Sequence, residues 1–211
     1  LGDVYKRQIK YGLSVTGLVN PKDVKKNNGT QCGDVLILTK PLGVGLTLNA
    51  LRMNDCSKEM QERVFKSMTT LNKYACDVLK KYDVHALTDV TGFGLLVHLN
   101  EMLDEKNSAV IYKDSIPYFD DCQKYVEEFY LSGAAQTNRN SVEGKISFDC
   151  DFFTEEILFD PQTSGGLLAS VSKADLEMLE KDFKENNLEL YVVGEVIEKN
   201  EYNVYVRGRK I

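Results

Sequence analysis

The feature that most constrains this chain is the run LTDVTGFGLL at residues 87–96. A short apolar segment from Val84 leads into Asp89, two glycines follow, and a pattern with helical spacing then begins. This order predicts a strand that ends at the aspartate, then a tight turn, then a helix. The fold must therefore accommodate a strand–turn–helix unit with one carboxylate at its turn.

Such a unit is typical of sites that hold a metal ion together with a phosphate group. A carboxylate is a hard oxygen ligand for Mg²⁺, the glycines let the backbone approach a bulky anion, and a helix N-terminus favours negative charge. We therefore interpret Asp89 as a candidate Mg²⁺ ligand and expect its carboxylate to face an open cleft. The alternative is that Asp89 only caps the helix that follows.

A second run, DPQTSGG at residues 160–166, is followed at once by an apolar strand pattern at residues 167–171. Its hydroxyl groups and glycine N–H groups could hold a phosphate or support a neighbouring site. The alternative is a loop in which the glycines only permit a sharp turn.

Three further features give weaker signals. The run KPLGVG at residues 40–45 has a Gly-x-Gly pair between a strand and a helix, but it lacks the Gly-Lys-Ser/Thr of a P-loop. Arg139, in a predicted polar loop at residues 133–140, either reaches an anion or is a solvated surface cation. The chain has two histidines, His85 and His98, and a lone helical histidine such as His98 is usually packed and hydrogen-bonded.

Strand and helix patterns alternate along the chain. Strands are expected at residues 11–19, 34–39, 84–89, 109–112, 167–171, 190–196 and 203–206. Helices are expected at residues 43–53, from a cap at 56–57 to about 82, at 93–103, from Pro117 to 129, and from a cap at Ser172 to about 187. Because the two kinds of element intermix, the predicted class is α/β, an α+β mixed sheet with packed helices.

Composition excludes several classes of function. The net charge is −6, and no block of lysines and arginines resembles a nucleic-acid footprint. No apolar stretch is long enough to cross a membrane, and no signal-peptide pattern is visible. The five cysteines form no CxxC pair and no zinc spacing, so we interpret them as reduced thiols: Cys32, Cys56, Cys76, Cys122 and Cys150. We expect a cytoplasmic protein that binds neither nucleic acid nor membrane.

Four segments, in order, strongly resemble the selenophosphate synthetases (selenide, water dikinases). They are YGLSVTGLV at 11–19, GDVLILTKPLG at 33–43, TDVTGFGLL at 88–96 with His98, and FDPQTSGGLL at 159–168. The second and fourth segments are specific to that family. The TDxTGxG core is shared with the wider superfamily of aminoimidazole ribonucleotide (AIR) synthetase-like ATP enzymes. The resemblance extends over residues 9–207.

The resemblance implies a domain organisation and an activity. Residues 1–8 match nothing, residues 9–28 would be the last strand of a truncated N-terminal ATP-binding domain plus a linker, and residues 29–211 would be the C-terminal AIR synthase-like domain. The family converts ATP, selenide and water to selenophosphate, AMP and phosphate with Mg²⁺, and it forms homodimers. On this resemblance Asp89 is a Mg²⁺ ligand, and the loop at residues 160–166 is expected to lie beside the turn at residues 88–94, so that both line one cleft.

The departures from the family pattern limit what this chain can do alone. The family's catalytic Cys or selenocysteine, its neighbouring Lys and its glycine-rich segment lie upstream of residue 9, so no catalytic residue is assigned here. The residues that contact ATP stay unknown. Val97 replaces a family glycine, and residues 136–140 match the family's Arg-Asn loop only loosely. We expect the chain to be inactive alone.

Two alternatives remain beside this interpretation. One is another ATP enzyme of the superfamily, such as a thiamine-monophosphate kinase or a hydrogenase-maturation protein, although the runs at 33–43 and 160–166 argue against it. The other is a non-catalytic binding domain that keeps the fold without the chemistry. The sequence upstream of Ile9 would distinguish these possibilities.

Overall fold

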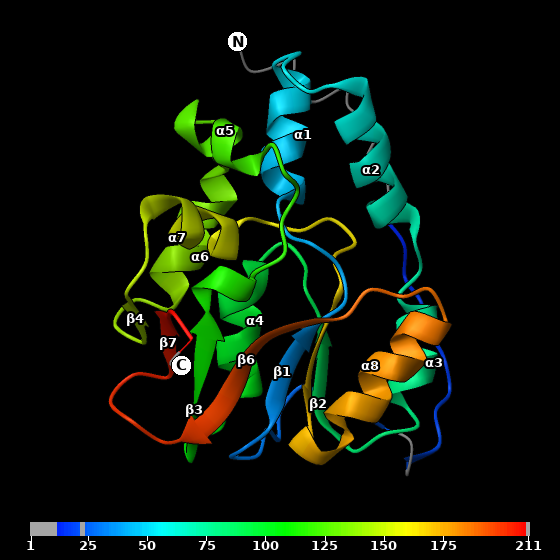
Figure 1. Cartoon of the computed structure of the whole chain (residues 1–211). Helices are drawn as coiled ribbons and strands as arrows, with labels where there is room; N and C mark the ends of the chain where they lie inside the picture. Colours follow the sequence, from blue (N-terminus) through cyan, green and yellow to red (C-terminus); the bar gives the residue numbers. More distant parts are fainter. Residues whose placement is uncertain (1–11, 22–23, 210–211) are drawn as a thin grey trace.

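The structure is a computed structural model that describes residues 12–21 and 24–209. Its described strands form one mixed sheet in the order β2-β5-β1-β6-β3-β7-β4 (Figure 1). The strands are β1 (Val35–Leu38), β2 (Val84–Asp89), β3 (Asn107–Tyr112), β4 (Ile146–Phe148), β5 (Leu167–Val171), β6 (Tyr191–Glu198) and β7 (Val204–Arg207). Strand β5 pairs antiparallel with both β2 and β1, so β1 and β2 run in the same direction and end at the same edge.

Helices cover both faces of the sheet and one of its ends. They are α1 (Val44–Arg52), α2 (Lys58–Thr69), α3 (Lys73–Leu79), α4 (Gly94–Met102), α5 (Cys122–Glu127), α6 (Gly133–Ser141), α7 (Phe152–Phe159) and α8 (Leu176–Glu185). Figure 1 shows α3 and α8 side by side on one face, with α1, α2 and α5 beyond the end of the sheet that β1 points to. The predicted mixed α/β class is confirmed.

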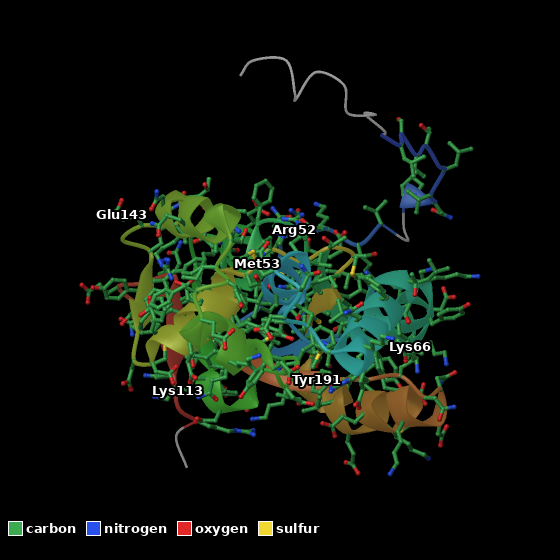
Figure 2. The ribbon with its side chains drawn as sticks, turned by 90° about the horizontal axis from the view of Figure 1, so that it is seen from above. Arg52, Met53, Lys66, Lys113, Glu143 and Tyr191 are labelled. Atoms are coloured by element: carbon green, nitrogen blue, oxygen red, sulfur yellow. The ribbon has the colours of Figure 1, made fainter. Side chains whose placement is uncertain are left out.

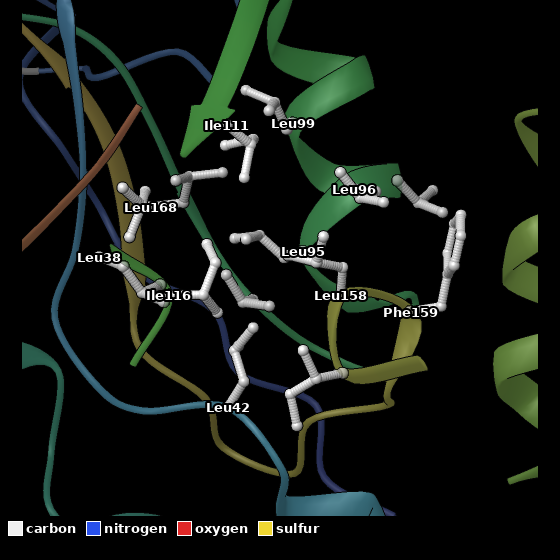
Figure 3. Close-up of a cluster of buried hydrophobic side chains, with 14 of the residues drawn as sticks. Leu38, Leu42, Leu95, Leu96, Leu99, Ile111, Ile116, Leu158, Phe159 and Leu168 are labelled. Carbon is white, nitrogen blue, oxygen red and sulfur yellow. The ribbon is translucent and has the colours of Figure 1, made fainter. Parts of the chain in front are cut away.

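Two apolar cores lie on the two faces of the sheet. Val35 and Ile37 of β1 pack with α3 and α8, whereas Leu36 and Leu38 face α4 and α7. This two-sided burial follows from the alternation of side chains along a strand. In the larger core, leucines of α4 pack against the sheet and α7, as Figure 3 shows for Leu95, Leu96 and Leu99.

A buried polar network joins the strands at the other end of the sheet. The Asp34 carboxylate accepts hydrogen bonds from the Ser170 hydroxyl at 2.5 Å and the Gln31 N–H at 2.9 Å. It also lies 2.9 Å from Nδ1 of His85, whose Nε2 is 3.1 Å from Asp83. Because Asp34 precedes β1, Ser170 is on β5 and His85 is on β2, the network ties three neighbouring strands together.

The predicted single helix from residue 57 to about 82 is two helices. Ser57 caps α2 as expected, since its side chain accepts the Met60 N–H at 3.1 Å. The backbone then adopts an extended conformation at Thr70, and α3 begins at Lys73. The break is stabilised by long-range contacts, because Thr70 O accepts from Lys40 Nζ and Asn72 Nδ2 donates to Gly165 O.

Two other predicted boundaries are wrong. The helix predicted from Pro117 begins only at Cys122, because residues 117–119 bond to Leu42 as an isolated bridge. Residues 133–140, predicted as a polar loop, are helical: the Ser132 side chain caps α6 by accepting the Ala134 N–H. The helix α7 and the short strand β4 were not predicted from the sequence.

The strand predicted at residues 11–19 is also wrong where the structure describes it. Residues 12–20 form neither helix nor strand, and Val15 and Leu18 are fully exposed. Tyr11 lies outside the described residues. A strand is stable only when it pairs with a neighbour, and no described segment pairs with this one. The described helices include none long and apolar enough to cross a membrane.

Candidate functional site

Three glycine-bearing loops meet at the end of the sheet where β1 and β2 terminate. The first loop is residues 39–43, between β1 and α1. The second is residues 90–93, between β2 and α4, and the third is residues 160–166, between α7 and β5. We call these three segments the loop cluster. Its members come from distant parts of the sequence. Backbone hydrogen bonds join the second loop to the third, and the Lys40 side chain joins the first loop to the third.

The second and third loops lie side by side, as the sequence predicted. Val90 N donates to Gly166 O at 2.8 Å, and Gln162 N donates to Thr91 O at 3.0 Å. Gly165 approaches the second loop so closely that an added Cβ would overlap Val90 O. Only glycine fits at this position, so the close approach of the two loops, and not just a sharp turn, requires Gly165.

The third loop also caps helix α1 from a distance of more than one hundred residues. Asp160 Oδ2 accepts the Gly45 N–H at 2.9 Å, and Gln162 Oε1 accepts the Val44 N–H at 3.3 Å. Asp160 is only 1% exposed, and burial raises its pKa to about 7 despite the hydrogen bond from Gly45. This contact explains the Asp-Pro-Gln part of the run: it satisfies the free N–H groups at the start of α1.

Asp89 stands at the edge of this cluster. It is the last residue of β2, pairs across the sheet with Leu167, and its side chain is exposed. Within the described residues its carboxylate has no hydrogen bond or ion pair. It does not cap α4, since that helix begins without a side-chain cap.

A metal site is not complete within the described part of the chain. No group of three or more His, Cys, Asp or Glu side chains is placed there to hold an ion. Mg²⁺ bound with nucleotides often takes only one or two protein carboxylates, its other ligands being water and phosphate oxygens. Asp89 therefore fits the role of a single ligand, with the remaining ligands supplied from elsewhere.

His98 has a structural role in the second loop. Its Nε2 accepts the Thr91 N–H at 3.2 Å and lies 3.0 Å from the Thr91 hydroxyl. Nδ1 then carries the proton and faces Glu101 at 3.4 Å. The histidine is 7% exposed, which confirms the expectation that it is packed and hydrogen-bonded.

Arg139 is neither free to meet an anion nor simply solvated. Its guanidinium pairs with the buried Glu156 at 2.6 Å and lies over the ring of Phe159. On the same helix, the buried Asn138 donates from Nδ2 to Gly92 O at 2.9 Å and to Phe159 O at 3.1 Å. Helix α6 thus supports the second loop through Asn138.

The cysteines do not form a reactive centre in the described part of the chain. All five are free, and they are dispersed over the fold. Cys122 is fully buried beneath the first loop, and burial raises the pKa of its thiol far above the usual value. We interpret it as a packing residue, because nucleophilic cysteines have lowered pKa values.

Sequence reasoning missed three side chains that organise the cluster: Lys40, Asn72 and Asn138. Asn72 and Asn138 donate to backbone carbonyls of the third and second loops. Lys40 is buried and donates to Ser164 O of the third loop. A lysine two positions after the apolar run 35–38 is the one sequence signal that could have identified Lys40.

Comparisons with known proteins identify one matching family model, relatives that are similar in sequence, and solved structures with a similar fold. Residues 31–207 match the family model described as AIR synthase related protein, C-terminal domain. A protein from Agathobacter rectalis named selenide, water dikinase is 44% identical over 200 residues, covering 94% of this chain and 58% of its own length. A relative of the same name from Desulfitobacterium hafniense is 41% identical over 95% of this chain and 59% of its own length.

Solved structures support the fold. Thiamine-monophosphate kinase from Stenotrophomonas maltophilia superposes with a TM-score of 0.62 at 16% identity, covering 92% of this chain and 56% of that one. E. coli HypE, a hydrogenase maturation protein, has a TM-score of 0.62 at 17% identity over 86% of this chain and 48% of its own. The chain spans about three fifths of the length of the curated relatives that it matches.

Proposed function

The chain belongs to the family of AIR synthase related proteins, whose C-terminal domain it matches, and we propose that it is the C-terminal part of a selenide, water dikinase. The observation that carries this proposal is the loop cluster with Asp89 at its edge, in a chain 41–44% identical to proteins of that name. The fold alone does not distinguish this activity from that of a thiamine-monophosphate kinase, because a solved structure of such a kinase has a similar fold at only 16% sequence identity.

We propose the division of labour that follows. Residues 9–28 would belong to an N-terminal ATP-binding domain with its linker, and residues 29–211 would form the domain that closes over it. ATP and selenide would be the substrates, and the complete protein would be a cytoplasmic homodimer. We assign the catalytic nucleophile to none of the described residues, so selenide activation would belong to the N-terminal domain.

The chain's own contribution is to position one carboxylate. Asp89 is fixed by its strand pairing with Leu167, while its side chain has no partner among the described residues. Mg²⁺, when bound, would neutralise charge on the nucleotide phosphates during phosphoryl transfer. The glycines of the second and third loops leave backbone N–H groups near the same edge, where a phosphate chain could approach.

A chimera tests this function. Residues 9–211 replace the matched part of the Agathobacter rectalis relative, and phosphorus NMR follows selenophosphate formation from ATP, Mg²⁺ and selenide. We expect the chimera to make selenophosphate, and the 211-residue chain alone to make none, because phosphoryl transfer needs several groups positioned at once. A folded chimera that hydrolyses ATP without forming selenophosphate would contradict the proposed activity.

Asp89→Asn in the same chimera tests the ligand role. We expect turnover to fall by about 100-fold or more, since one metal ligand contributes several kcal/mol to transition-state stabilisation. Asp104→Asn is the matched control, because Asp104 is exposed at the opposite end of the sheet and its bond to Lys106 N is one that asparagine can also make. Turnover unchanged by Asp89→Asn at limiting Mg²⁺ would exclude the ligand role.

A further inference from the structure

Lys40 is a buried cation without a counter-ion among the residues that the structure describes. The residue is 7% exposed, and its ammonium donates to Thr70 O at 2.8 Å and Ser164 O at 2.9 Å. Both partners are neutral carbonyls, and no described carboxylate pairs with it. Burial lowers the pKa of Lys40 below its usual value. A lysine is seldom buried unless its charge is paired, and its third N–H remains available.

A pocket of about 420 Å³ opens beside this lysine. It lies on the α2 side of the loop cluster, between the end of β1, the break between α2 and α3, and residues 187–189. Its polar and charged lining includes Lys40, Arg63, Lys66, Ser67, Asn72 and Glu189. Figure 2 labels Lys66 between helix α2 and helix α8, on the side where this pocket lies. The volume suits a small organic ligand.

The charges around the pocket do not cancel. Lys66 forms no ion pair with any described residue, and Arg63 is paired with Asp120 at 2.6 Å. Glu189 is exposed and is the one carboxylate among the described residues that line the pocket. Two lysines without a carboxylate partner among the described residues, the buried Lys40 and the exposed Lys66, therefore line this pocket in a chain whose net charge is −6.

We propose that this pocket binds a phosphate-bearing anion, with Lys40 and Lys66 as its charge partners. Lysine binds phosphate as a compact point charge, and charge-assisted hydrogen bonds are the strongest available there. A dianionic phosphate matches two ammonium groups, and the Ser67 hydroxyl adds a neutral donor at the rim. The proposal stands apart from the selenide, water dikinase activity, because the unpaired cations alone define the ligand's chemistry.

Titration calorimetry of the 211-residue chain with inorganic phosphate at low salt tests the pocket. We expect phosphate to bind, and Lys66→Gln to weaken its affinity by about tenfold, as the loss of one charge-assisted hydrogen bond implies. Lys58→Gln is the matched control: it removes the same charge from an exposed position at the other end of α2, and affinity should be unchanged. Lys66 is the position to vary because Lys40 also holds the loops together.

The same titration with AMP identifies the source of the phosphate. If phosphate and AMP both bind and both are weakened by Lys66→Gln, the pocket recognises the phosphate group itself. Binding of AMP alone, weakened by Lys66→Gln, assigns the pocket to a nucleotide, and binding of phosphate alone assigns it to the free anion. Absence of binding to both, or binding that Lys66→Gln leaves intact, would overturn the proposal whatever the chimera's turnover shows.

Discussion

Asp34 and Asp89 stand at opposite ends of the parallel strands β1 and β2, and their surroundings differ completely. Asp34 is 3% exposed, and its carboxylate contacts the Ser170 hydroxyl, the Gln31 N–H and the His85 imidazole. Asp89 is exposed, and its carboxylate has no partner among the described residues. One aspartate is fully used inside the fold, whereas the other is left available.

The two ends of the sheet are also joined by different means. At the Asp34 end, charged and hydroxyl side chains link β2, β5 and β1 directly. At the Asp89 end, backbone groups of the loop cluster bond to one another, as in the contact from Val90 N to Gly166 O. Side chains such as Lys40 and Asn138 support these loops, but the Asp89 carboxylate takes no part in the contacts among the described residues. The difference therefore indicates which aspartate serves the fold and which is open to chemistry.

The largest effect is expected at the structural end. Asp34→Asn removes the charge that pairs with His85 and disturbs the bonds to Ser170 and Gln31. Breaking a buried pair of this kind costs about 3 kcal/mol of unfolding free energy, which urea unfolding of the 211-residue chain can measure. A loss within the error of the measurement would show that the network does not hold the strands together.

The next effect tests whether close backbone contact holds the open end. Gly165→Ala places a Cβ against Val90 O and Gln162 Cβ, so we expect a cost of about 1–3 kcal/mol from overpacking. Gly92→Ala is the matched control in the neighbouring loop, because a Cβ there meets nothing within 4 Å. Equal unfolding free energies for the two variants would contradict the close approach that the structure assigns to Gly165.

Much of the open end could be predicted from the sequence because its signals are local. The strand ending at Asp89, the turn after it and the strand at residues 167–171 all follow from apolar runs bounded by glycine. The pairing of residues 160–166 with residues 88–94 was also predicted, on the resemblance to a family, and is confirmed by the contacts of Val90 and Gln162.

The rest could not be predicted because it depends on contacts between distant residues. The break at Thr70 is stabilised by Lys40, thirty positions away, and no local pattern encodes it. Asn138 reaches Gly92 from a polar segment whose composition is typical of a loop. The alternation at residues 12–19 is that of a strand, yet a strand also needs a partner, and local pattern says nothing about partners.

A smaller effect is expected from pH, because the contribution of His85 at the structural end to the free energy of unfolding should fall as the pH rises. Partial burial lowers the pKa of His85, but the hydrogen bonds and charges of Asp34 and Asp83 outweigh this effect and raise the pKa above its usual value. A raised pKa stabilises the fold below the unfolded-state value, and this stabilisation is lost as pH rises through the folded-state value.

The comparison of wild type with His85→Gln isolates this contribution. We expect the difference in unfolding free energy to be larger near pH 6 than near pH 9, by at most about 1 kcal/mol, because solvent screens a partly exposed imidazole. A difference that is constant over this range would mean that the charge of His85 does not contribute, and that only its packing does.

The smallest effect is expected for Asp89→Asn, the counterpart of Asp34→Asn at the open end. The substitution keeps the size of the side chain and removes a charge that no described residue pairs with, so the unfolding free energy should change by less than about 0.5 kcal/mol. Urea unfolding of both variants under one set of conditions gives the contrast directly. A large loss of stability with Asp89→Asn would mean that this carboxylate has a structural partner, and the distinction between the two ends would fail. A negligible loss, together with the fall in turnover expected in the chimera, would mean that Asp89 serves a ligand and not the fold.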